Sequence, residues 1–367
     1  MRRNAFLAGV FTSAAMAVIA LSGAQTYRYP FQNPGLSLEQ RVEDLVTRLS
    51  PDEKIAQLQH NSPAVSRLGI PAHFWKHDPA KGSARAGTVF PQPIGLAASF
   101  NPELAMEVAG ALSDELRAKN NDAVRRGVRD AQTNLTLWLP EPNVLRDPRW
   151  GGGQNSFGED PFLASRFAVA YAKGIQGTDP DFLKVLAAPR GFAPFSGPGS
   201  GVARFNAGVS RHDLHSSYLP AFEALVREAR PWAVVSAPNR VNGLAAAATP
   251  YLLEDMLRER WGFRGVVISD CGGQGRSPEE IAKAVRAGTD LDCAVCNRAL
   301  VEARKKGLVT EEQIEASLRR AFAARFKLGQ FDPGGSVIHS KIALSVVDSP
   351  RHRRLALEAA RQSIVLL

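Results

Sequence analysis

The stretch that points most directly to a fold is Gly-Val-Val-Ile-Ser-Asp at residues 265–270. Its apolar, β-branched residues end on a carboxylate, which is typical of a buried strand that finishes at a polar edge. Similar short apolar runs occur upstream at residues 135–139, 183–187 and 233–236. The chain is therefore expected to contain a series of short, buried strands.

Helical patterns separate these runs. Apolar residues recur at helical spacing over residues 161–175, 214–229, 250–261 and 278–287. Strands that alternate with helices form a parallel sheet with crossover connections, and right-handed units of this kind close readily into a barrel. A TIM-type (β/α)8 barrel needs about 250 residues or more. We therefore predict an α/β protein in which one such barrel, regular or irregular, accounts for most of the 367 residues.

Asp270 lies where a barrel of this type carries its chemistry. Catalytic groups occur at the carboxyl ends of barrel strands, and Asp270 directly follows the 265–269 run. An aspartate at a strand end can equally cap the next turn. The residues alone give these two roles equal weight.

The first 24 residues have the layout of an export signal. Arg2 and Arg3 precede an apolar core at residues 5–21, and Ser-Gly-Ala at residues 22–24 offers small residues for cleavage. An uncleaved membrane anchor is the alternative, but the apolar core is near the lower length limit for spanning a bilayer. We therefore expect an exported chain, periplasmic or extracellular.

Charge and cysteine content exclude some classes of partner. The formal charge is +9, but the basic residues are scattered, without long runs or interleaved aromatic residues, so we expect no nucleic-acid binding. The three cysteines are Cys271, Cys293 and Cys296. They lack a second Cys/His pair, so a zinc site is not expected. A structural disulfide or plain thiols remain as alternatives.

Several longer motifs resemble those of one enzyme family. They are Asp147-Pro-Arg-Trp-Gly151 followed by Gly158-Glu-Asp-Pro161, then Asn239-Arg-Val-Asn-Gly243, the block from Trp261 to Cys271, and Ala287-Gly-Thr-Asp-Leu-Asp-Cys293. Together they resemble family 3 glycoside hydrolases, in particular the β-xylosidase-like branch. Several long motifs in one order are far more specific than a single short one. The resemblance implies the family's amino-terminal barrel for residues 25–344. Residues 345–367 would then be an exit segment toward a second α/β domain that the chain lacks.

The resemblance also implies an activity and its residues. It is that of a retaining hydrolase of terminal β-O-glycosidic bonds, which needs no metal or cofactor and takes a β-linked oligosaccharide as its partner. Asp270 falls on the nucleophile that attacks the anomeric carbon. Substrate-binding positions fall on Asp78, Asn143 and Arg190. The acid/base is not identified; family members often take it from the second domain, which a separate gene could encode here.

Some positions depart from the family pattern. The arginine that closes the Asp-Pro-Arg-Trp-Gly-Arg motif falls on Gly152, the family's Lys-His pair falls on Arg190 and Gly191, and a tyrosine falls on Pro238. Charge-assisted hydrogen bonds to sugar hydroxyls are worth roughly 1.5–3 kcal/mol each. The loss of two would weaken transition-state binding on the order of 100-fold. The resemblance therefore implies an altered sugar site.

Three functions remain open from the sequence. The first is a working exo-β-glycosidase in carbohydrate catabolism. The second is a catalytically inactive, carbohydrate-binding barrel, and the third is a truncated remnant. The family resemblance favours the hydrolase, whereas the altered site favours the two inactive alternatives.

Overall fold

The computed structural model describes residues 27–76, 87–147, 149–195, 197, 205–270, 277–293 and 297–366. The expected export signal at residues 1–24 lies outside these ranges, as do Asp78, Cys271 and Cys296. None of the helices in these ranges combines the length and apolar character needed to cross a membrane.

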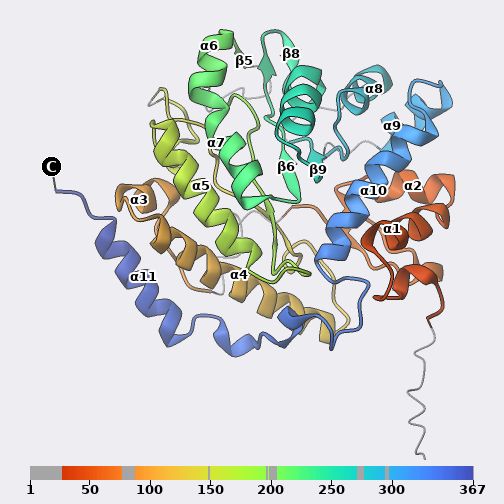
Figure 1. Ribbon diagram of the computed structural model, residues 1–367, viewed down its shortest axis with the longest axis horizontal. Coiled ribbons are helices and arrows are strands. Elements are labelled where there is room, and N and C mark those ends of the chain that lie inside the picture. Colours follow the sequence, from red (N-terminus) through yellow and green to blue (C-terminus); the bar gives the residue numbers. More distant parts are fainter. Residues whose placement is uncertain are drawn as a thin grey trace, which may run out of the picture.

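Short, fully buried strands occupy the centre of the molecule (Figure 1). β3 (Thr136–Trp138) pairs in parallel with β4 (Leu186–Ala188). β6 (Ala233–Val235) pairs in parallel with β9 (Val266–Ile268). All four coincide or overlap with the apolar runs of the sequence, because a strand that is covered on both faces needs a nearly continuous run of apolar side chains.

Further parallel bridges join these pairs into a ring. The bridges are Phe192–Ser236, Ile268–Leu291 and Gln59–Asp292. The last of them brings an early segment of the chain against a late one, which closes the barrel. The predicted α/β class and TIM-type barrel are confirmed.

The barrel is irregular near its first strands. β1 (Asn61–Ser62) and β2 (His73–Phe74) pair in antiparallel fashion. A side chain then links β2 to β3, because the indole Nε1 of Trp138 donates to the carbonyl oxygen of Trp75 at 2.8 Å. The irregularity that the sequence left open is thus located between β1 and β3.

Helices surround the strands. The α-helices are α1 (Leu38–Thr47), α2 (Pro51–Gln57), α3 (Pro93–Ala98), α4 (Pro102–Arg125), α5 (Pro161–Gln176), α6 (Arg211–Asp213), α7 (Pro220–Ala224), α8 (Pro278–Arg286), α9 (Asn297–Lys305), α10 (Glu311–Lys327) and α11 (Pro350–Gln362). The π-helical segments are η7 (Leu214–Tyr218), η8 (Leu225–Ala229) and η10 (Tyr251–Arg260). Single 3-10 turns are η1 (Pro30–Gln32), η2 (Ser66–Leu68), η5 (Gly153–Asn155), η9 (Ala246–Ala248), η11 (Ile338–Lys341) and η12 (Leu344–Val346). A small outer sheet contains β5 (Asn206–Ala207), β7 (Arg240–Val241) and β8 (Leu244–Ala245).

Helix α4 begins as its sequence predicts but ends later. The Asn101 side chain caps it by accepting from the backbone nitrogen of Leu104 at 3.0 Å. A helix over residues 101–119 is expected from the pattern, yet α4 continues to Arg125. Asn121 donates to the carbonyls of His339 and Ile342. These long-range contacts stabilise a final part of the helix that propensity alone does not favour.

The carboxyl-terminal segment lies along the outside of the barrel. α11 packs against α3 and α4 (Figure 1). The buried carboxylate of Glu115 in α4 accepts from the backbone nitrogen of Asp348 at 3.0 Å, and it lies 2.9 Å from Nδ1 of His352. Residues of the expected exit segment are therefore anchored on this barrel.

Candidate active site

Three charged side chains follow the carboxyl ends of barrel strands. Glu141 comes shortly after β3, Arg190 shortly after β4, and Asp270 directly after Ser269 at the end of β9. Parallel strands of a barrel end on one face, so the fold gathers these segments there.

Glu141 and Arg190 form a buried ion pair on this face. Glu141 is 1% exposed, and its Oε1 lies 2.8 Å from a guanidinium nitrogen of Arg190. Burial raises the pKa of Glu141 to about 7; the cation of Arg190 opposes this rise, and the negative charge of Asp270 adds to it. Asp270 therefore lies within electrostatic reach of the pair.

The pair leaves buried polar atoms without hydrogen-bond partners. Within the part of the chain that the structure describes, these include Oε2 of Glu141 and Nε of Arg190. Three further buried atoms among the described residues also lack a hydrogen-bond partner: Nε1 of Trp150, Oγ of Ser236 and Oδ1 of Asn239. Buried polar groups are normally paired, so the unpaired atoms of Glu141 and Arg190 indicate a place for a polar ligand or for ordered water.

Asn143, predicted from the resemblance to bind substrate, holds a loop in this structure. Its Nδ2 donates to the carbonyl oxygen of Gly191 at 2.8 Å, and its Oδ1 accepts from the backbone nitrogen of Phe195 at 2.9 Å. The side chain is completely buried. A direct contact between Asn143 and substrate stays a prediction, whereas its contribution to placing residues 191–195 follows from these bonds.

Glycine fits the local structure at two positions that depart from the family pattern: at Gly191 through its backbone conformation, and at Gly152 through the Trp150 side chain that lies against it. Gly191 has a φ of +80°, and a Cβ there would lie 2.5 Å from Nδ2 of Asn143. A Cβ at Gly152 would lie 2.9 Å from the ring of Trp150. Trp150 itself packs edge-on against Phe195, with the ring centroids 5.7 Å apart. Larger side chains at these positions would require the surrounding residues to move.

Next to Asp270, Ser269 connects two strand ends. Its hydroxyl donates to Oδ1 of Asp292 at 2.5 Å and accepts from the backbone nitrogen of Cys293 at 3.1 Å. Cys293 is disulfide-bonded. Of the two alternatives that the sequence left open, a disulfide and not a plain thiol is therefore present at this cysteine. Asp78, the remaining predicted substrate-binding residue, lies outside the described residues.

The described ranges contain no group of three or more His, Cys, Asp or Glu side chains suited to hold a metal ion. On this face Glu141 pairs with Arg190, and Asp292 accepts from the hydroxyl of Ser269. The chemistry available from them is that of carboxylates and a guanidinium group.

Comparison with known proteins is consistent with these motifs and this barrel. Residues 40–324 match the model of the glycosyl hydrolase family 3 N terminal domain. The chain belongs to glycoside hydrolase family 3. It is 38% identical to the xylan 1,4-beta-xylosidase of Xylanibacter ruminicola, in an alignment that covers 98% of this chain and 43% of that protein. Beta-D-xylosidase 1 of Arabidopsis thaliana is 37% identical over 92% of this chain and 46% of its own length.

Solved structures of the family show the same fold. The GH3 exo-beta-xylosidase XlnD, in complex with a xylobiose aziridine activity-based probe, superposes with a TM-score of 0.83 at 27% identity. That match covers 92% of this chain and 46% of the XlnD chain. The chain thus spans less than half the length of the curated relatives described above.

Sequence reasoning missed Glu141. The signal was present, because Pro-Glu at residues 140–141 directly follows the 135–139 strand run and places an acid near a strand end. Glu141 precedes the motif that begins at Asp147 and belongs to none of the family motifs named above. Its pairing with Arg190 required the tertiary structure, because the two residues come from different barrel units.

Proposed function

We propose that this family 3 chain acts as a retaining hydrolase of terminal β-O-glycosidic bonds, of β-xylosidase or β-glucosidase type, with Asp270 as its nucleophile. The observation that carries the proposal is the position of Asp270 at the carboxyl end of β9, within electrostatic reach of the Glu141–Arg190 pair. The names of the relatives, xylosidases and glucosidases among them, support the substrate class.

The proposed chemistry begins with attack by the Asp270 carboxylate on the anomeric carbon. The bond to the leaving oxygen breaks, a glycosyl ester forms on Asp270, and water later hydrolyses that ester. Arg190, whose side chain is 28% exposed, is the cation placed to hold a sugar hydroxyl. Glu141 is almost fully buried, so we assign it to positioning Arg190 and not to transferring a proton to the leaving group.

The most direct test traps the first step. A 2-deoxy-2-fluoro-β-xyloside or glucoside with a dinitrophenolate leaving group needs no acid catalyst to form the ester. It therefore reports on the nucleophile whatever group supplies the proton in the natural reaction. We expect stoichiometric release of dinitrophenolate and, by peptide mass spectrometry, a fluoro-sugar on Asp270.

Two variants make the result interpretable. Asp270→Asn should abolish labelling, whereas Glu159→Gln, an exposed acid near the start of α5, should be labelled like the natural chain. Absence of label on Asp270 in a folded natural chain would exclude the proposed nucleophile. Labelling without turnover of aryl β-xylosides would confirm the nucleophile and locate the deficiency either in protonation of the leaving group or in hydrolysis of the ester.

A second candidate is a sugar-binding barrel without chemistry. Gly152 and Gly191 favour it, because neither position supplies a side chain to the site, and a Cβ would lie 2.9 Å from Trp150 at the first and 2.5 Å from Asn143 at the second. Calorimetry with xylobiose and cellobiose distinguishes the two: saturable heat together with no label on Asp270 supports binding alone. Neither heat nor label would count against both functions.

We also propose export, as the pattern of residues 1–24 suggests. Expression in a bacterial host followed by amino-terminal sequencing of the periplasmic or secreted product tests this. A mature chain that begins near residue 25 is expected, whereas full-length protein retained in the cytoplasm would contradict it.

A further inference from the structure

Glu115, near the middle of α4, is a buried acid that the proposed hydrolase chemistry does not use. It is 2% exposed. Its Oε1 accepts from the hydroxyl of Thr88 at 2.7 Å, from the backbone nitrogen of Asp348 at 3.0 Å and from Nδ1 of His352 at 2.9 Å. Its Oε2 accepts from the backbone nitrogen of Thr88 at 3.0 Å. One carboxylate thus holds two segments that lie far apart in the sequence.

The later of these segments belongs to a strap along the outside of the barrel. We call residues 343–362, which include α11, the carboxyl-terminal strap (Figure 1). Asn121 of α4 donates to two carbonyl oxygens just before the strap, and Nδ2 of Asn101 donates to Oε1 of Gln362 at its far end. These outer attachments are neutral amide groups. Glu115 is the ionisable attachment between them.

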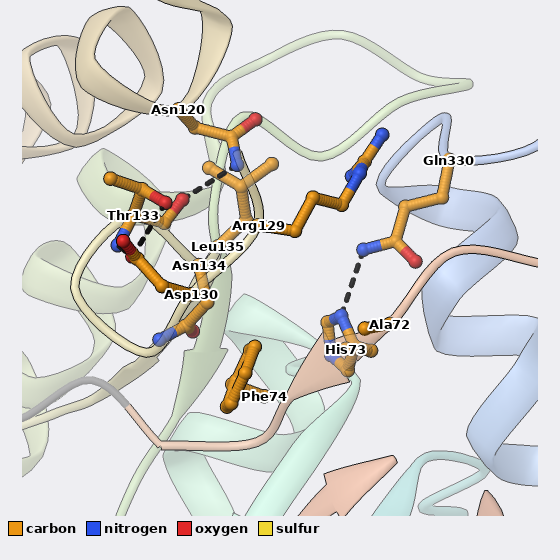
Figure 2. Close-up of a pocket in the computed structure, with 10 residues that line it drawn as sticks. All are labelled: Ala72, His73, Phe74, Asn120, Arg129, Asp130, Thr133, Asn134, Leu135 and Gln330. Atoms are coloured by element: carbon orange, nitrogen blue, oxygen red, sulfur yellow. Dashed lines mark hydrogen bonds between the residues drawn. The ribbon is translucent and has the colours of Figure 1, made fainter. Parts of the chain in front are cut away.

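Helix α4 is held in place independently of the strap. The hydroxyl of Ser113 donates to the carbonyl oxygen of Gly174 in α5 at 3.1 Å. Nδ2 of Asn120 donates to the carbonyl oxygen of Thr133, in the loop that leads into β3, at 2.6 Å (Figure 2). None of these groups ionises. The helix is therefore a fixed base from which the strap can detach.

Protonation of Glu115 is incompatible with the contacts that it makes. Four donors point at its two oxygens, so a hydrogen on either oxygen meets a donor instead of an acceptor. The bonds that survive also lose the charge assistance that makes such bonds roughly twice as strong as neutral ones. Nδ1 of His352 donates whether its ring is neutral or charged, so titration of the histidine leaves its own bond intact.

The described groups around Glu115 favour its ionised form. Lys119 lies one turn further along α4, and a Cβ at Gly87 would lie 3.1 Å from its Nζ and 2.4 Å from Oε2 of Glu115. The carboxylate of Asp348 is paired with Arg353. Burial raises the pKa of Glu115, but its hydrogen bonds outweigh burial and hold the pKa below the ordinary value of 4.5. The stability that they contribute is therefore complete above pH 4.5 and is lost as pH falls through the folded-state pKa.

We propose that Glu115 is an acid-sensitive latch, which holds residues 87–91 and residues 347–353 on α4 and releases both when its carboxylate takes up a proton. The neutral attachments at Asn121 and Asn101 keep the ends of the strap in place, so the release is local. Residues 87–91 lead into α3, which packs against α11, so the two released segments are neighbours. The latch is independent of the proposed hydrolase activity and of Asp270.

Hydrogen exchange of the purified full chain from pH 7 down to pH 3 tests the latch. Protection factors are compared, because they correct for the intrinsic effect of pH on amide exchange. We expect protection to fall together in peptides that cover residues 87–91 and 347–353, at a pH above that of global unfolding. Tryptophan fluorescence follows global unfolding in parallel, and protection at residues 339–342, beside Asn121, should not change before it. Loss of protection only in the global transition, or in one of the two segments alone, would overturn the proposal.

Glu115→Gln is the neutral counterpart of the protonated latch. At pH 7 it should lower protection in both segments by about 10-fold or more, the effect of losing a hydrogen bond to a charged group. Glu107→Gln, an exposed acid on the same helix, is the matched control and should behave like the natural chain at every pH. Full protection of Glu115→Gln at pH 7 would show that this carboxylate is not the latch. The pH series on the natural chain decides the question even if Glu115→Gln does not fold.

His352→Asn separates the two ionisable partners of the latch. The asparagine amide can donate in place of Nδ1 but takes up no proton in this pH range. The variant should therefore keep the acid response of both segments. If that response disappeared, the histidine and not Glu115 would be the acid sensor, and the proposal would be wrong.

Discussion

Glu141 is a buried acid whose charge state depends on a single cation and on a neighbouring carboxylate. Its Oε1 meets Arg190, and its Oε2 has no hydrogen-bond partner among the residues described. A buried carboxyl in such surroundings holds its proton to higher pH than a solvated one. The consequence is a pH dependence of stability that can be assigned to one residue.

The first prediction concerns this pH dependence. Between the ordinary pKa of 4.5 and the folded-state pKa of about 7, the folded protein holds a proton that the unfolded chain has released. The free energy of unfolding should therefore fall as pH rises through that window, by roughly 3 kcal/mol. Glu141→Gln should remove this component, which urea unfolding at pH 5 and pH 8 measures. Glu159→Gln is the exposed control, and an unchanged difference between the two pH values in Glu141→Gln would refute the assignment.

The second prediction concerns the cation of the same pair. Arg190→Met leaves the Glu141 carboxylate buried without a positive partner, which costs about 3–5 kcal/mol where the acid is ionised. The cost should be largest at pH 8 and should shrink at pH 5, where Glu141 is protonated. Equal destabilisation at both pH values would mean that Arg190 contributes through packing alone. In the double variant with Glu141→Gln, the pH dependence of the Arg190→Met effect should disappear.

At the scale of elements, the loop after β4 is shaped by glycine and by Asn143. Gly191 adopts a left-handed backbone conformation, and the carbonyl of that residue accepts from the Asn143 amide. The family pattern places histidine there, yet the conformation seen here disfavours any side chain. The loop and the Asn143 side chain therefore form one structural unit.

The third prediction tests that unit. Gly191→Ala combines a left-handed residue with a contact of 2.5 Å to Asn143, and should cost about 2 kcal/mol or more in the free energy of unfolding. Gly208→Ala is the control, because a Cβ there meets no atom within 4 Å and the backbone is not left-handed. Chemical unfolding of both variants gives the comparison. Equal stability of the two would show that the loop adjusts freely.

For the molecule as a whole, Asp290 ties together segments that are distant in sequence. Its carboxylate is fully buried and accepts from Arg258 of η10 at 2.9 Å, from Arg320 of α10 at 2.6 Å and from the backbone nitrogen of Val267 in β9 at 2.8 Å. These bonds fasten two outer helices to the barrel wall beside Asp270. Asp290 belongs to a family motif, and its contacts in this structure are those of a structural residue.

The fourth prediction follows from this arrangement. Asp290→Asn leaves two arginines facing a neutral amide and should cost about 3–5 kcal/mol in global stability. Thermal unfolding should show the loss in a single transition, because the contacts join β9 to helices on either side. Glu259→Gln, an exposed acid at the end of η10, should change Tm little. If hydrogen exchange showed a loss of protection in α10 alone, Asp290 would not stabilise the barrel as a whole, and the prediction would be wrong.

The sequence by itself determined the barrel class, most strand positions and the starts of the helices. These features are local: β-branched runs specify buried strands, and Ser37, Ser50 and Asn101 cap the helices that follow them. Motifs in a fixed order were also sufficient to identify the family and to single out Asp270.

The tertiary structure alone decided what surrounds Asp270. The Glu141–Arg190 pair, the loop held by Asn143 and the antiparallel β2 all join residues from different segments of the chain. No periodicity or cap encodes such contacts. They arise when barrel closure removes charged and polar groups from water together, and burial then determines their partners and their pKa values.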